Sequence, residues 1–323
     1  MISSHPKADG MESPFAKIAV VGLGLIGGSV ALAARHRWPA LSIVGIDRPE
    51  VLARVAARFA AIETAADLDS VRGADLIVLA APVPEILDML GRLPGRADAG
   101  AIVTDVGSTK RAIVERAGRL APTVTFVGGH PLAGAATSGF DSARPDLFDG
   151  RTWLLTPTPG CDPRPVERLC RFVSGLGACP RAIDAQAHDR LMAALSHLPQ
   201  LAASMLMRVA GELAGPGGLD LAGAGLFDTT RLAASPPEVW SGICATNADH
   251  LGSALDQYIA ALTSLRSALT DPARIHEAFT RAGEWRRRLE QALVSTPGPA
   301  EREPGTTRCA SDRRGAGSHP EGC

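Results

Sequence analysis

The stretch Lys17-Ile-Ala-Val-Val-Gly22-Leu-Gly24-Leu-Ile-Gly27 decides the fold of this chain. A short apolar run leads directly into three glycines at the spacing GxGxxG, and residues 28–37 continue with helical composition. The first glycine permits a tight turn, the second lets a ligand phosphate approach bare backbone, and the third lets helix and strand pack closely. Free N–H groups at the start of the helix attract that phosphate. The stretch therefore predicts a strand, turn and helix that bind a dinucleotide.

Asp47 indicates which dinucleotide is bound. It ends a second strand-like run, 41–47, twenty residues after Gly27. A carboxylate there accepts hydrogen bonds from ribose hydroxyls and repels a 2′-phosphate, which favours NAD. Arg48 weakens that repulsion, so NADP stays open, and Asp47 could instead only cap the helix that begins at Pro49. The expected cofactor-binding residues are Gly22, Gly24, Leu25, Ile26, Gly27, Asp47, Arg48, Ala81 and Pro82, the last two also being compatible with a simple helix start.

The alternation of apolar runs and helical segments predicts an α/β fold in the first part of the chain. Further strands are expected at 74–81, 101–106 and 123–127, and then near 153–155 and 179–183. Strands that are almost wholly apolar lie in parallel sheets covered on both faces. After Asp184, Ala- and Leu-rich helical segments follow at 185–214, 237–269 and 272–294. We expect a doubly wound parallel sheet domain, 17–183, followed by an all-α domain, 184–294, with a disordered leader, 1–16, and a disordered tail, 295–323.

Composition excludes several classes of protein. A net charge of −1 provides no basic field for nucleic acid or for an anionic membrane. The six cysteines form no CxxC pair and no metal-ligand cluster, so no metal is expected and the thiols indicate a reducing, cytoplasmic compartment. The apolar run 18–34 is short and rich in glycine, which favours a buried strand and helix over a membrane span.

Four further motifs narrow the function. They are Asp105-Val-Gly-Ser108-Thr-Lys110, Gly128-Gly-His130-Pro-Leu-Ala-Gly134, the segment from His188 to Gln200 and the segment from Asp228 to Trp240. With the glycine turn, these resemble the motifs GxGLIGGS, DxGSxK, GGHPxAG, HDxxxAxxSHLPH and DxTRxAxSxxxxW of the prephenate and arogenate dehydrogenases, in the same order. The resemblance covers residues 17–294. It implies oxidative decarboxylation of a cyclohexadienol in tyrosine biosynthesis, with NAD as hydride acceptor, and a homodimer formed through the helical domain.

The resemblance also implies roles for individual residues. One base must remove the hydroxyl proton near neutral pH, and His130 is the candidate, oriented by a hydrogen bond from Ser108. Arg231 matches the arginine that binds a substrate carboxylate, for which its planar fork is suited. The structural alternatives are a loop-capping role for His130 and a surface ion pair between Arg231 and Asp228.

The segment from His188 to Gln200 carries further expected substrate contacts. Pro199 should kink its helix, so that His197 and Gln200 share the face turned toward the cleft. Gln200 replaces the histidine that ends the family motif, which leaves open how the substrate side chain is recognised. Trp240 is either a pocket wall or a packing aromatic, and His188 is expected to be structural.

Three other functions have different requirements of the sequence. A dehydrogenase of 4-amino-4-deoxyprephenate could use the same base and arginine. A β-hydroxyacid dehydrogenase needs a catalytic lysine in the helical domain, but no lysine follows Lys110. A non-catalytic NAD-sensing module would not need Ser108, His130 and Arg231 together.

Overall fold

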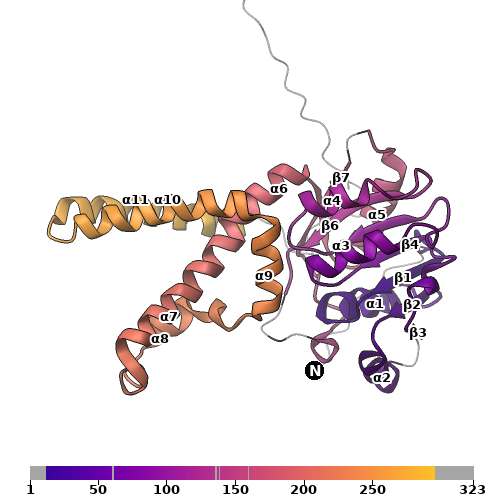
Figure 1. Ribbon diagram of the computed structural model, residues 1–323, viewed down its shortest axis with the longest axis horizontal. Coiled ribbons are helices and arrows are strands. Elements are labelled where there is room, and N and C mark those ends of the chain that lie inside the picture. The colour runs from indigo at the N-terminus through magenta and orange to yellow at the C-terminus, as the bar shows by residue number, and fades with distance from the viewer. Residues whose placement is uncertain (1–11, 60–61, 135–136, 138, 159, 295–323) are drawn as a thin grey trace, which may run out of the picture.

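The computed structural model describes residues 12–294 except 60, 61, 135, 136, 138 and 159 (Figure 1). An eight-stranded sheet flanked by helices makes up the first part of the chain. The described residues after Ala182 form helices and no strand. The expected tail, 295–323, and the first eleven residues of the expected leader lie outside the described residues.

The sheet has the strand order β3-β2-β1-β4-β5-β6-β7-β8. The strands are β1 Lys17–Val21, β2 Ser42–Ile46, β3 Glu63–Ala65, β4 Leu76–Leu79, β5 Ile102–Asp105, β6 Thr125–Pro131, β7 Thr152–Pro157 and β8 Cys179–Ala182. From β3 to β6 every neighbouring pair is parallel. The order turns back between β1 and β4, so ligands are expected beyond the carboxyl ends of these strands. The doubly wound fold is confirmed.

The expectation of a wholly parallel sheet is wrong at β7. This strand runs antiparallel to β6 and pairs Leu154 with His130, while β8 is again parallel to β7. The described part of the connection 132–151 contains a 3-10 turn, Phe140–Ser142, and no α-helix. A parallel return normally needs a crossover helix, so the chain comes back in the opposite direction.

Helices cover both faces of the sheet, and each face has its own apolar core. In β1, Ile18 and Val20 pack into one core, and Ala19 and Val21 into the other. Side chains of α1 and α5 complete the first core, and those of α3 and α4 the second. The helices of this domain are α1 Leu25–Arg37, α2 Pro49–Arg58, α3 Val83–Arg92, α4 Arg111–Ala117 and α5 Pro163–Gly175.

The expected disordered leader ends earlier than residue 16. Phe15 is 2% exposed and meets the ring of Phe172 edge-on, with ring centroids 5.6 Å apart. The guanidinium of Arg168 lies 4.6 Å from the centroid of the Phe15 ring and donates to the carbonyl of Pro14. The segment just before β1 is therefore part of the sheet domain, because one aromatic side chain anchors it.

The helical domain projects away from the sheet domain (Figure 1). Its helices are α6 Ala185–Met192, α7 Leu198–Leu219, α8 Ala224–Thr229, α9 Pro237–Thr246, α10 Ala248–Ser267 and α11 Pro272–Val294. The helical segment expected over 237–269 is present and consists of two helices, α9 and α10, which meet at Asn247. In the described part of the chain, no helix is both long and apolar enough to cross a membrane.

A π-helical turn, Ala193–His197, joins α6 to α7. Pro199 lies in the first turn of α7 and has no N–H to donate to the turn before it. The expected disturbance of the helix before Pro199 is thus present, in the form of one wider turn. This turn places His197 at the start of α7, next to the sheet domain.

Candidate active site

The glycine turn has the packing that a dinucleotide site requires. Gly22 has a φ of +95°, and a Cβ there would lie 2.2 Å from the carbonyl oxygen of Ala80. A Cβ on Gly27 would lie 1.9 Å from the carbonyl oxygen of Gly22, so only glycine lets α1 approach β1 this closely. A Cβ on Gly24 would meet nothing within 4 Å. The open position at Gly24 leaves its backbone accessible to a phosphate.

Asp47 lies directly after β2 and contacts the glycine turn. Its Oδ2 accepts from the N–H of Leu23 at 2.6 Å, and its Oδ1 accepts from the N–H of Arg48 at 2.7 Å. Arg48, not Asp47, is the N-cap residue of α2, so the helix-capping alternative for Asp47 is wrong. A carboxylate has about four acceptor positions, so capacity remains for ribose hydroxyls.

The other expected cofactor residues lie around the same turn. Leu25 and Ile26 form the first positions of α1. Ala81 and Pro82 join β4 to α3, with Pro82 as the N-cap residue, so the helix-start interpretation of this pair holds. Because a Cβ on Gly22 would strike Ala80, the β4–α3 junction lies against the glycine turn.

A buried ion pair supports the loops beneath the site. Lys110 and Asp105 are both 0% exposed, and the ammonium of Lys110 contacts Oδ2 of Asp105. Asp105 also accepts from the N–H groups of Gly107 at 2.8 Å and Gly129 at 3.0 Å. The end of β5 is thereby bonded to the residue just before His130, which places the imidazole at the edge of the sheet.

His130 is bonded to the helical domain and not to the expected serine. Its Nδ1 lies 2.9 Å from Nε2 of His188 in α6. Within the described residues, Ser108 makes no hydrogen bond to His130, so the expected orienting contact is absent. Burial lowers the pKa of His130 well below its usual value, and the neighbouring His188 lowers it further. The imidazole is therefore neutral at neutral pH, as a general base must be.

Asp189 connects the two domains. Its carboxylate accepts from the N–H groups of Lys110 at 2.7 Å and Arg111 at 3.0 Å, and from Nδ1–H of His188 at 2.8 Å. Burial alone would raise the pKa of Asp189, but these hydrogen bonds lower it overall. Arg111 also forms an ion pair with Asp249 at the start of α10. The helical domain thus docks onto the start of α4 through charged hydrogen bonds.

His197 lies in the same cluster. It is 1% exposed, its Nδ1 lies 3.3 Å from Nδ2 of Asn247, and its ring meets Trp240 edge-on at 5.9 Å. Its Nε2 is buried without a hydrogen-bond partner among the described residues. Burial lowers the pKa of His197 to about 4. A buried ring nitrogen without a partner is costly, which makes it available to a polar ligand.

Gln200 and Arg231 belong to a neighbouring part of the helical domain. The amide of Gln200 donates to the carbonyl of Leu232 at 2.6 Å and accepts from the hydroxyl of Ser235 at 3.2 Å. These bonds use both the nitrogen and the oxygen of the amide to fix the 3-10 turn Arg231–Ala234. The Arg231 side chain is exposed, and no ion pair with Asp228 forms among the described residues.

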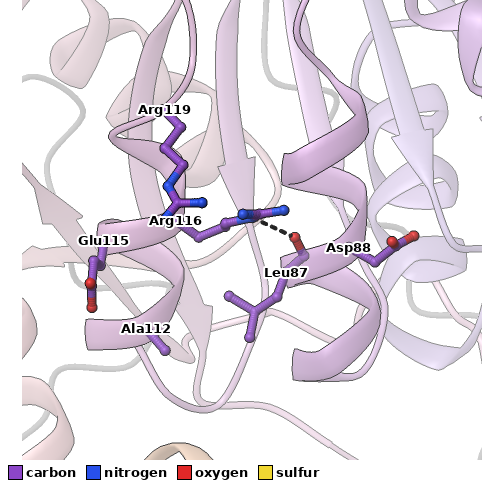
Figure 2. Close-up of a pocket in the computed structure, with 6 residues that line it drawn as sticks. All are labelled: Leu87, Asp88, Ala112, Glu115, Arg116 and Arg119. Carbon is purple, nitrogen blue, oxygen red and sulfur yellow. Dashed lines mark hydrogen bonds between the residues drawn. The ribbon is translucent and has the colours of Figure 1, made fainter.

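The groove in Figure 2 lies outside this site. Leu87 and Asp88 of α3 line it together with residues of α4, and Arg116 donates to the carbonyl of Leu87 at 3.2 Å. Its charged side chains belong to a surface between two helices. The site lies instead at the first residues of α4, where Lys110 and Arg111 bind Asp189.

The contacts that join the domains are not evident from the sequence. It predicts a structural role for His188 and no functional role for Asp189, Arg111 and Asn247. The adjacent pair His188 and Asp189 within one motif was the available signal, because a carboxylate often orients a histidine. The partner of that histidine, 58 positions earlier in the chain, could not be inferred from spacing.

Comparisons with known proteins agree with this arrangement. The family model of the prephenate dehydrogenase nucleotide-binding domain matches residues 30–180, and that of its dimerization domain matches residues 184–281. Prephenate dehydrogenase of Bacillus subtilis is 33% identical over 277 residues, which are 83% of this chain and 75% of that protein. Cyclohexadienyl dehydrogenase of Zymomonas mobilis is 32% identical over 260 residues, covering 79% and 89%.

Solved structures give the same result. The crystal structure of prephenate dehydrogenase from Aquifex aeolicus superposes with a TM-score of 0.77 at 25% identity, covering 84% of this chain and 99% of that one. Synechocystis arogenate dehydrogenase superposes with a TM-score of 0.72 at 32% identity, with the same coverage. Since both domain models match in order and relatives more than 30% identical cover most of the chain, this chain belongs to the prephenate dehydrogenase family.

Proposed function

We propose that this protein oxidises and decarboxylates prephenate, arogenate or both, giving 4-hydroxyphenylpyruvate or tyrosine with reduction of NAD. The observation that carries the proposal is His130, a neutral imidazole held by β6 and α6 at the carboxyl edge of the sheet, the edge at which the glycine turn also lies. In this reaction a base takes the proton of the ring hydroxyl, and a hydride leaves the carbon that bears this hydroxyl. Loss of CO2 then makes the ring aromatic.

NAD is the proposed cofactor, and it supplies the hydride acceptor when it is bound. The open backbone at Gly24 suits the pyrophosphate, and Asp47 suits the ribose hydroxyls. The Arg48 guanidinium lies 3.9 Å from Asp47 and 3.6 Å from Glu50, so two carboxylates offset the one charge that could attract a 2′-phosphate. This balance supports NAD over NADP. The related Aquifex aeolicus prephenate dehydrogenase has been crystallised with NAD+.

His130 is the proposed base, and the substrate contacts come from the helical domain. His197 offers its unpartnered Nε2 to a polar group of the substrate, and Trp240 packs against that ring. Arg231 binds a carboxylate, and Gln200 acts by holding the turn that carries Arg231. Ser108 lies in the loop between β5 and α4 and makes no bond to His130 among the described residues. Its proposed role is therefore to contact the cofactor or the substrate.

We also propose a cytoplasmic homodimer. Large apolar side chains of α7, α8 and α11 are exposed, among them Leu213 at 84%, Phe227 at 76% and Trp285 at 66%. An apolar surface of this kind marks a protein interface. The matched dimerization domain supports the same assembly. Light scattering of the full chain should give twice the mass of 33.5 kDa.

Steady-state formation of NADH and NADPH, with each of three substrates, tests the proposal. Prephenate or arogenate with NAD should give turnover, and 4-amino-4-deoxyprephenate is the competing substrate. His130→Asn should lower kcat by about 10²–10⁴ with KM little changed, because only the base is lost. A protein that binds NAD but turns over none of the three would support the sensing module. Wild-type kcat in His130→Asn would refute the assignment of the base.

A further inference from the structure

Three side chains, two of them fully buried, form one continuous line of hydrogen bonds that ends at the base. Oδ1 of Asp189 lies 2.8 Å from Nδ1 of His188, and Nε2 of His188 lies 2.9 Å from Nδ1 of His130. His188 and Asp189 are 0% exposed, whereas His130 keeps partial exposure. The remaining nitrogen of His130, Nε2, has no partner among the described residues. The line thus begins in the interior and ends at an open ring nitrogen.

The protonation of each group follows from the one before it. Asp189 already accepts two backbone N–H groups and the Nε–H of Arg111 at 3.2 Å, so it is an ionised acceptor. A carboxylate that can only accept requires His188 to carry its proton on Nδ1. Burial lowers the pKa of His188, so the ring is neutral and its Nε2 has a lone pair. His130 must then donate from Nδ1, which leaves the lone pair of His130 on Nε2.

We propose that Asp189 and His188 are positioning residues that fix His130 in the tautomer whose Nε2 can accept the substrate proton. The inference rests on the proposed function, in which His130 is the base. The substrate O–H bond breaks, its proton moves to Nε2, and His130 becomes an imidazolium that still donates from Nδ1 to His188. The carboxylate of Asp189 stabilises that charge through the intervening ring.

The line also joins the two domains. His130 belongs to β6 of the sheet domain, whereas His188 and Asp189 belong to α6 of the helical domain. Asp189 is in turn bonded to backbone N–H groups at the start of α4. Docking of α6 against α4 therefore sets the orientation of a base that neither domain orients alone.

Selective 15N labelling of histidine in the full-length protein reads the tautomer directly. In the wild type, 15N chemical shifts of His130, assigned with His130→Asn, should show Nδ1 protonated and Nε2 unprotonated at neutral pH. In His188→Phe, which keeps a ring but removes the acceptor, the His130 signals should shift toward a mixture of tautomers. Protonation of Nε2 in the wild type would overturn the proposal.

Kinetics of three variants supply the second measurement. His188→Phe should lower kcat by about 10- to 100-fold with KM within a few-fold, a part of what a general base contributes. His188→Gln can offer its carbonyl oxygen near the position of Nε2, so it should recover most of kcat. His250→Gln, which changes a partly exposed histidine bonded to Gln186, is the control and should match the wild type.

The two proposals fail in different ways. Full kcat in His188→Phe together with an inactive His130→Asn would refute the positioning role and leave the function intact. Full kcat in His130→Asn would refute the base itself. If His188→Phe does not fold, the wild-type tautomer and the His188→Gln variant still decide. A kcat of His188→Gln about 10- to 100-fold below the wild type, with His130 shifts like those of the wild type, would contradict the proposal.

Discussion

Arg231 is the residue through which substrate charge would be recognised, in a chain whose net charge is only −1. Its side chain is exposed, and its turn is held from below by Gln200. Arg231→Ala should raise KM by about 10- to 100-fold, the effect of losing roughly 1.5–3 kcal/mol of charged hydrogen bonding, and should lower kcat much less. Arg231→Lys should lie between, because an ammonium cannot form two parallel bonds. A wild-type KM in Arg231→Ala would contradict the assignment.

The sequence identifies candidate site residues better than it identifies the hydrogen-bond partners of those residues. The motif GGHPxAG selects His130 by resemblance, whereas Asp47 and the three glycines are selected by their offsets from strand ends. The bond from His130 to His188 was missed, and one from Ser108 was expected in its place. Partner choice depends on how α6 docks against the sheet domain, and no local pattern in the chain encodes that docking.

The 3-10 turn Arg231–Ala234 is an element that depends on one side chain beneath it. Gln200→Leu should remove one of the two bonds of the Leu232 carbonyl, which keeps the N–H of Ser235 at 3.1 Å, and should leave the Ser235 hydroxyl without its partner, costing about 1–3 kcal/mol of stability. KM should rise more than kcat falls, because the turn carries Arg231. Urea unfolding and steady-state kinetics measure both effects.

Ser204→Ala is the matched control for that experiment. It removes only the 3.4 Å contact between Gln200 and the Ser204 hydroxyl and keeps both bonds to the turn. It should resemble the wild type in stability and in KM. Equal KM values for Gln200→Leu and Ser204→Ala would show that the turn does not depend on the amide.

Among the elements, the strands were predicted more reliably than the breaks between helices. β1 has the expected bounds because its apolar residues are buried on both faces of the sheet. The break at Asn247 was missed, since helical composition continues through it. Its amide donates to the carbonyl of Asp189 at 2.8 Å, a contact between distant parts of the chain that sequence periodicity does not record. The antiparallel direction of β7 was also missed, because it follows from the connection 132–151, whose described part contains no α-helix.

For the molecule as a whole, three histidines whose pKa is lowered by burial make stability depend on pH. Burial lowers the pKa of His130, His188 and His197 in the folded protein. Their stabilisation is complete above the ordinary value of about 6.5 and is lost as the pH falls below it, because the unfolded chain then binds more protons. For His197, with a folded pKa of about 4, the loss is about 2 kcal/mol by pH 5.

Urea unfolding at pH 7.5 and pH 5.0, at one protein concentration, measures this loss. The free energy of unfolding should be lower at pH 5.0, and His197→Gln should reduce the difference between the two values. Equal stability of the wild type at both pH values would contradict the burial of neutral imidazoles.

The π-helical turn Ala193–His197 has one consequence for the entire molecule. Removing a single residue from it would let the chain wind as a regular α-helix from α6 into α7. Each residue of an α-helix turns the chain by roughly 100°, so everything after the deletion would swing about the helix axis by that angle. The apolar surface of the later helices, at which we propose that two copies meet, would then face another direction, and the deletion should abolish the dimer. The one extra residue of the π-helical turn thus sets the direction in which the surface of the later helices faces.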